Sequence, residues 1–126
     1  MKKALPVIAL VLMAGQLLHA QTVKLNADAF EKKMAATDKK IILDVRTIEE
    51  FSQGHLVGAV DIDFYKTDFK ERLGKLDKSK PVFVYCLAGG RSNSAAKMMS
   101  DMGFLTVYDL DGGYRSWSSA GKAVVK

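Results

Sequence analysis

Hydrophobic positions along this chain switch repeatedly between the spacing of buried strands and the spacing of helices. Four short runs predict strands at 40–45, 58–64, 81–85 and 105–110, and the runs at 40–45 and 81–85 are nearly all apolar, as in strands buried on both faces. Helix-like spacing, capping residues and glycine stops predict helices at 26–40, 46–54, 67–76, 91–103 and 112–121. Strands that alternate with helices indicate an α/β fold, in which helices flank a parallel sheet on both faces.

Several of these helices have capping residues at their predicted ends. Asn26 can cap the first helix, and Thr47 with Glu50 three residues later forms a capping box. Gly54 and Gly103 can end the second and fourth helices. No internal repeat, low-complexity tract or linker interrupts the pattern, so we expect one domain over residues 21–126.

The first 20 residues differ from the rest. Lys2 and Lys3 form a basic start, and an apolar run of 11 residues extends from Ala4 to Ala14. Such a run is shorter than the roughly 20 residues that span a bilayer, and it has the size of the apolar part of a signal peptide. We expect residues 1–20 to be a signal peptide, cleaved after Ala20, that exports the protein to the periplasm or the medium. A retained anchor or a packed N-terminal helix is the alternative.

The net charge and its distribution indicate which partners the chain can bind. The full chain has a formal net charge of +5, and without Lys2 and Lys3 it keeps 17 basic and 14 acidic residues. The basic residues are scattered among acidic ones, which is typical of a solvated mixed surface. We therefore expect no nucleic-acid partner, and no stable membrane span once residues 1–20 are removed.

Cys86 is the only cysteine of the chain. Exported domains usually use cysteines in pairs, but a single cysteine cannot form an intrachain disulfide. It is therefore an inert buried thiol, an intermolecular linker or a reactive group. Its place at the carboxyl end of the 81–85 strand favours the reactive group, because open parallel sheets bind ligands beyond these ends.

The loop that follows, residues 87–92, contains the groups that stabilise a thiolate. A free thiol has a pKa near 8.5, so only about 3% of it is ionised at neutral pH. Gly89 and Gly90 allow backbone amides to turn inward, and Arg91 supplies a positive charge. Ser92 can cap the helix that begins there, and the amino end of a helix also favours an anion.

Three motifs resemble the rhodanese (thiosulfate sulfurtransferase) family, in particular its small single-domain exported members. The active-site pattern Cys-x-x-Gly-x-Arg-Ser is matched by Cys86, Gly89, Arg91 and Ser92. An earlier signature is matched by Asp44, Arg46, Glu50, Phe51, Gly54, His55, Gly58 and Ala59. A late signature is matched by Gly112, Gly113 and Trp117. Together these motifs cover essentially all of residues 21–126.

The resemblance implies a rhodanese-like fold with a parallel five-stranded sheet, and covalent catalysis in two half-reactions. Cys86 would take the outer sulfur of thiosulfate or a similar small anion and become a persulfide, which cyanide or a thiol would then discharge. No metal or organic cofactor is implied, and another protein could give or accept the sulfur. The implied substrate-binding residues are Leu87, Ala88, Gly89, Gly90, Arg91 and Ser92.

Loop length separates this reaction from those of related enzymes. Four residues lie between Cys86 and Arg91, whereas related phosphatases and arsenate reductases place five there. The smaller ring favours a sulfur atom over a tetrahedral oxyanion. A persulfide carrier without small-molecule turnover would share the same loop and stays the first alternative, ahead of a phosphatase or arsenate reductase.

Other marked residues are expected to have mainly structural roles. Asp44 and Arg46 stand two apart at a strand end, so both are expected on one side, as secondary site residues. An ion pair of Arg46 with Glu50 is expected. His55 and Trp117 are expected to contribute to packing rather than to chemistry.

Overall fold

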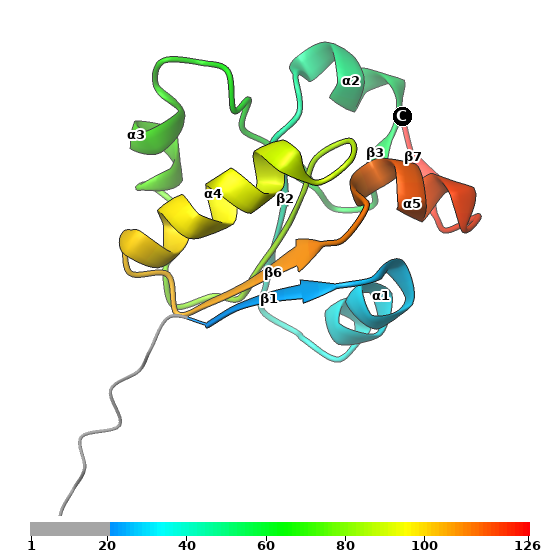
Figure 1. Cartoon of the computed structure of the whole chain (residues 1–126), viewed down its shortest axis with the longest axis horizontal. Helices are drawn as coiled ribbons and strands as arrows, with labels where there is room; N and C mark the ends of the chain where they lie inside the picture. Colours follow the sequence, from blue (N-terminus) through cyan, green and yellow to red (C-terminus); the bar gives the residue numbers. More distant parts are fainter. Residues whose placement is uncertain (1–20) are drawn as a thin grey trace, which may run out of the picture.

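The computed structural model describes residues 21–126, and its centre is a parallel sheet with the strand order β1-β6-β5-β2-β4 (Figure 1). Each neighbouring pair of strands runs parallel. The predicted α/β fold with a parallel five-stranded sheet is therefore confirmed. The expected signal peptide lies outside the described residues. The strands of this sheet are β1 Gln21–Leu25, β2 Ile41–Asp44, β4 Val60–Asp61, β5 Val82–Tyr85 and β6 Thr106–Leu110.

Helices cover both faces of the sheet, as predicted (Figure 1). On one face, α3 and α4 bury side chains such as Leu73 and Met99. On the other face, α1 and α5 bury Phe30 and Trp117. No helix among residues 21–126 is long and apolar enough to cross a membrane. The helices are α1 Ala27–Ala35, α2 Ile48–Gln53, α3 Phe69–Leu73, α4 Gly90–Asp101 and α5 Gly113–Ser119.

Strand β5 is buried on both faces, and this burial explains why its sequence is apolar at every position. Val82 and Val84 belong to the core beneath α3 and α4, whereas Phe83 and Tyr85 belong to the core beneath α1 and α5. Successive side chains of a strand point to opposite faces, so a central strand between two helical layers needs an apolar residue at every position. This rigid strand positions Cys86, which follows it directly.

Three strands are absent from the predicted set. Strand β1 lies at the sheet edge beside β6 and is mostly exposed, and its sequence QTVKL is half polar. Strands β3 His55–Leu56 and β7 Val124–Val125 form a separate antiparallel pair. Edge strands and two-residue strands bury too little apolar surface to leave a periodic signal in the sequence.

The predicted caps of α1 and α2 are present. The Asn26 side chain accepts a hydrogen bond from the Ala29 amide at 2.9 Å. Thr47 and Glu50 form the capping box, and Gly54 follows the last residue of α2 with a φ of 153°. The capping box also fixes the position of the Glu50 carboxylate, which accepts hydrogen bonds from Arg91 beside Cys86.

Candidate active site

The parallel arrangement brings the loops after β2, β4, β5 and β6 to one edge of the sheet. Asp44 ends β2, Asp61 ends β4, and Cys86 follows β5. Asp44 lies in register with both Asp61 and Tyr85. The thiol is thus placed where parallel sheets present ligands, as the sequence pattern predicts.

The thiol of Cys86 is 1% exposed and lies within hydrogen-bonding distance of the loop that follows it. The Gly89 amide donates to Sγ at 3.1 Å, and the thiol donates to Ser92 Oγ at 3.5 Å. Burial opposes ionisation of this thiol. The hydroxyl and amide of Ser92 and the amides of Gly89 and Ala88 outweigh that effect, so the pKa of Cys86 lies below its ordinary value. The loop therefore stabilises a thiolate.

Helix α4 begins earlier than the sequence predicts. Its first residue is Gly90, and Gly89 precedes it in the left-handed region, with a φ of 118°. The expectation that Ser92 caps the helix is wrong, because Ser92 already lies inside the first turn and is fully buried. Its hydroxyl donates to the Gly89 carbonyl at 3.2 Å and faces the sulfur instead.

Arg91 is held by an acid from another helix. Its two terminal nitrogens donate to the two carboxylate oxygens of Glu50 at 2.7 and 3.0 Å. Arg91 holds the pKa of Glu50 at about 2, well below the ordinary value of 4.5. The expected pair of Arg46 with Glu50 is therefore wrong: the capping box turns Glu50 towards α4, where Arg91 meets it with a bidentate fork.

Arg46 pairs with Asp44 instead. Its Nη2 lies 2.7 Å from Asp44 Oδ2 and donates to the Gly54 carbonyl at 2.6 Å. The two side chains lie on the same side of the strand end, as predicted, and are almost fully buried. The Arg46 guanidinium also lies 4.2 Å from the centre of the Tyr114 ring. These contacts fasten the end of α2 to the sheet and to α5.

A surface pocket of about 310 Å³ lies beside the loop. It joins Leu87 of the Cys86 loop to three residues of the earlier signature and to Gln53 and Tyr114, which no motif marks. Its lining residues are Arg46, Glu50, Gln53, Gly54, Leu87 and Tyr114.

The backbone at the start of α5 holds the Cys86 loop from the other side. The Tyr114 amide donates to the Cys86 carbonyl at 2.7 Å, and the Arg115 amide donates to the Leu87 carbonyl at 3.0 Å. Gly113 makes this approach possible, because a Cβ there would lie 2.5 Å from the Cys86 oxygen. The late glycine motif therefore acts on the active-site loop directly.

Asp61 is an unusual acid at the same edge. Burial and the neighbouring carboxylates of Asp44 and Asp63 raise the pKa of Asp61 to about 7. Its Oδ2 atom is buried without a hydrogen-bond partner. Although three acids lie near one another, no group of three or more His, Cys, Asp and Glu side chains within residues 21–126 is arranged to hold a metal ion.

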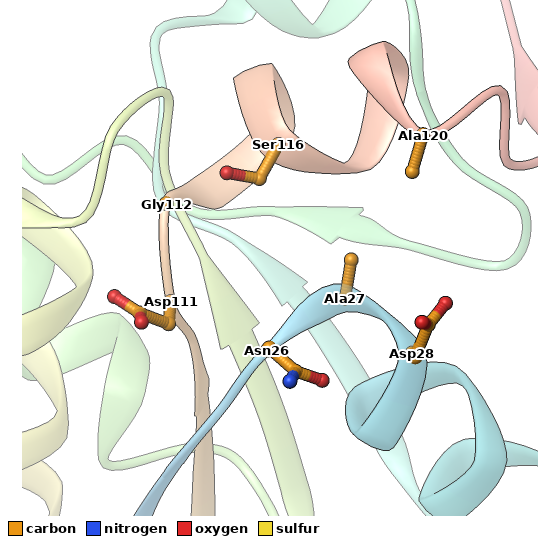
Figure 2. A pocket seen from close by; sticks show the side chains of 7 residues that line it. All are labelled: Asn26, Ala27, Asp28, Asp111, Gly112, Ser116 and Ala120. Atoms are coloured by element: carbon orange, nitrogen blue, oxygen red, sulfur yellow. The ribbon is translucent and has the colours of Figure 1, made fainter.

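A second pocket, of about 360 Å³, lies between the beginnings of α1 and α5 (Figure 2). It contains none of the residues of the Cys86 loop, so we assign the chemistry to the loop and not to this pocket. The residues that line this second pocket are Asn26, Ala27, Asp28, Asp111, Gly112, Ser116 and Ala120.

His55 and Trp117 contribute to packing, as predicted. His55 stacks on Phe51 with 3.6 Å between the ring centres, and Trp117 is 3% exposed.

Comparison with known proteins agrees with this geometry. The sequence model of the Rhodanese-like domain matches residues 26–120. The chain belongs to the rhodanese-like family. A solved structure of a rhodanese-related protein from Thermoplasma volcanium superposes with a TM-score of 0.72 at 28% identity, over 82% of this chain and 97% of that chain. The rhodanese-like fold is therefore shown by sequence and by structure.

Two of the relatives have names that point to different functions. The thiosulfate sulfurtransferase GlpE of Coxiella burnetii is 37% identical over 79 residues, which cover 63% of this chain and 72% of GlpE. The putative sulfur carrier protein YrkF of Bacillus subtilis is 32% identical over 95 residues, which cover 75% of this chain. The matched region spans only 50% of the length of YrkF.

The contact at Gly113 predicts that its substitution damages the active site. Gly113→Ala is expected to destabilise the fold by about 3 kcal/mol and to lower the reactivity of Cys86, because the new methyl group displaces the loop. Gly121→Ala is the matched control, since Gly121 also has a positive φ but has open space around its Cβ position. It should cost about 1 kcal/mol, with normal Cys86 reactivity. Thermal unfolding and thiol alkylation measure both; equal effects of the two variants would contradict the prediction.

The raised pKa of Asp61 predicts a pH-dependent gain in stability when its charge is removed. The folded protein holds this proton up to about pH 7, whereas an unfolded carboxyl loses it near 3.8, so stability falls as pH rises between these values. Asp61→Asn should therefore raise the free energy of unfolding by about 1 kcal/mol at mildly alkaline pH and by nothing in acid. Denaturant unfolding across pH measures the gain. Asp38→Asn, at an exposed site, is the control; a gain that does not vary with pH would refute this account.

Proposed function

We propose that this protein transfers a sulfane sulfur from thiosulfate, or a similar small anion, to cyanide or a thiol through a persulfide on Cys86. The single observation that carries the proposal is the loop around the thiol, where the Gly89 amide and the Ser92 hydroxyl lower the pKa of Cys86. The relative named thiosulfate sulfurtransferase supports the same reaction.

The proposed reaction has two displacements at sulfur. The Cys86 thiolate attacks the outer sulfur of thiosulfate, a new S–S bond forms, and the old S–S bond breaks with its electron pair leaving on sulfite. Cyanide then attacks the outer sulfur of the persulfide. Thiocyanate forms, and the electron pair of the Cys86 persulfide bond returns to the thiolate.

Backbone amides provide most of the attraction for the anionic donor in this proposal. Arg91 is already neutralised by the bidentate contact with Glu50, and its side chain is only 15% exposed. The amides of Ala88, Gly89 and Ser92 act on the sulfur of Cys86, so they can equally hold the added sulfur of the persulfide. The pocket beside Leu87 offers room for the remainder of a larger donor or acceptor.

A persulfide carrier is the second candidate, and the relative named as a putative sulfur carrier supports it. A carrier would accept sulfur from one protein and deliver it to another without rapid turnover of small molecules. With either function we propose export directed by residues 1–20, on the grounds of the basic start and apolar run given above.

The proposed reaction is tested by incubating the purified chain with thiosulfate and cyanide and measuring thiocyanate. We expect thiocyanate from the natural chain and only background from Cys86→Ser, with a mass gain of one sulfur on Cys86 after thiosulfate alone. Thiocyanate no higher than in the Cys86→Ser control would refute the enzyme. A gained sulfur without turnover would favour the carrier, and hydrolysis of an aryl phosphate would favour a phosphatase.

A further inference from the structure

Tyr114 contacts the Cys86 loop through its backbone and the buried Arg46 through its ring, and none of the sequence motifs marks it. Its amide donates to the Cys86 carbonyl at 2.7 Å. The centre of its ring lies 4.2 Å from the central guanidinium carbon of Arg46, and the ring stacks on Tyr85 with 6.4 Å between the ring centres. The function proposed above gives this side chain no role other than lining a pocket.

Two hydrogen bonds from α5 set the orientation of two peptide groups in the loop. The Tyr114 amide holds the Cys86 carbonyl, and the Arg115 amide holds the Leu87 carbonyl at 3.0 Å. A trans peptide group is planar, and its carbonyl and its N–H point in opposite directions. The two carbonyls point towards α5, so the N–H groups of the same peptide units, which belong to Leu87 and Ala88, point away from it.

One of these two N–H groups acts on the sulfur. Burial opposes ionisation of the Cys86 thiol, and the Ala88 amide is one of the groups that, together with Ser92 and Gly89, bring its pKa below the ordinary value. The Gly89 amide, one residue further along, donates to Sγ at 3.1 Å. The hydrogen bonds from α5 therefore orient an amide that stabilises the thiolate.

The start of α5 needs a support of its own, because the helix has only seven residues. An isolated helix of this length is not stable in water. Trp117 is buried and fastens the later part of α5 to the core, whereas the ring of Tyr114 packs against Arg46 at its beginning. The residue whose amide holds the Cys86 carbonyl is therefore also the residue whose ring docks the helix.

Arg46 is a fixed surface for this ring. Its Nη2 atom lies 2.7 Å from Asp44 Oδ2 and donates to the Gly54 carbonyl at 2.6 Å, and its side chain is 3% exposed. A guanidinium group attracts the face of an aromatic ring, and the attraction is stronger where water is excluded. The ring of Tyr114 therefore rests on a group that its own hydrogen bonds hold in place.

We propose that Tyr114 is a positioning residue for Cys86. The contact of its ring with Arg46 holds the start of α5, and the amides of α5 in turn hold the peptide groups after Cys86 so that the loop N–H groups face the sulfur. The effect of the ring on the sulfur passes through the backbone, and no proton or electron moves. The role connects the end of β2, the Cys86 loop and the late glycine motif.

Loosening α5 should raise the pKa of Cys86 whichever way the loop relaxes. If the loop stays closed, burial still opposes ionisation and fewer amides compensate for it. If the loop opens to water, the thiol returns to its ordinary pKa, which lies above that of the folded protein. A substitution at Tyr114 leaves in place the ionisable side chains on the elements around the loop, which include Asp44, Arg46, Glu50, Arg91, Asp109 and Arg115.

The experiment measures how the rate of Cys86 alkylation by iodoacetamide, a neutral probe, depends on pH in the full chain. Tyr114→Leu should raise the midpoint of this pH profile by about one unit, which corresponds to about one lost hydrogen bond to a charged sulfur. Tyr114→Phe, which keeps the ring on Arg46, should keep the midpoint of the natural protein.

Tyr108→Leu is the matched control. Tyr108 is also a half-buried tyrosine of the core beneath α1 and α5, and it also has a cation over its ring, with Lys33 Nζ 5.6 Å from the ring centre. Its backbone belongs to β6 and not to α5. This variant should therefore lose stability in thermal unfolding, as Tyr114→Leu does, without a change in the midpoint of the alkylation profile.

The inference rests on the reactive Cys86 of the proposed function, but alkylation needs no sulfur transfer, so the two can fail separately. An unchanged midpoint in folded Tyr114→Leu overturns the inference, whatever the result with thiosulfate. A midpoint that rises as far in Tyr114→Phe or in Tyr108→Leu as in Tyr114→Leu overturns it as well, because the contact between the ring and Arg46 would then not be the cause.

If Tyr114→Leu does not fold, amide hydrogen exchange in the natural chain decides. Coupling between two groups is reciprocal, so an ionised Cys86 must hold the amides of α5 more tightly than a protonated one. Protection of the Tyr114 and Arg115 amides, corrected for the intrinsic effect of pH on exchange, should rise about tenfold across the midpoint of Cys86. It should stay constant in Cys86→Ser, and the same protection profile in both chains refutes the connection.

Discussion

A sulfur anion inside a protein needs donors that replace the water it has lost, and the backbone around Cys86 provides them. Burial alone would raise the pKa of the thiol, yet the net effect of the loop lowers it. Gly89 turns through a positive φ so that its amide reaches the sulfur, and Gly113 allows α5 to hold the Cys86 carbonyl from behind. The reactive group is therefore a property of the folded loop more than of the cysteine itself.

Two ion pairs at this site each join an arginine to a carboxylate, and they connect different elements of the fold. The Asp44 and Arg46 pair is buried and connects the end of β2 to the last residues of α2. The Arg91 and Glu50 pair is partly exposed and connects α2 to the active-site helix. Because Glu50 also completes the capping box, one carboxylate sets both the start of α2 and the position of the loop arginine.

Local patterns in the sequence predict most of this fold, and contacts between distant segments account for what they leave out. Strands β2, β5 and β6 have apolar runs that burial imposes, whereas the edge strands β1 and β4 are largely exposed. The Cys86 loop is continuous in sequence, so its nucleophile and glycines can be recognised there. The partner of Arg91 lies 41 residues away, and the approach of Gly113 to Cys86 depends on how α5 packs; neither has a local signal.

The early start of α4 decides what the Ser92 hydroxyl contacts. With Gly90 as the first helical residue, Ser92 falls in the first turn, where its buried hydroxyl accepts from the Cys86 thiol and donates to the Gly89 carbonyl. A helix beginning at Ser92 would use that hydroxyl to cap the first amides and would leave the sulfur without this contact. The residue at which α4 begins therefore helps to lower the pKa of Cys86.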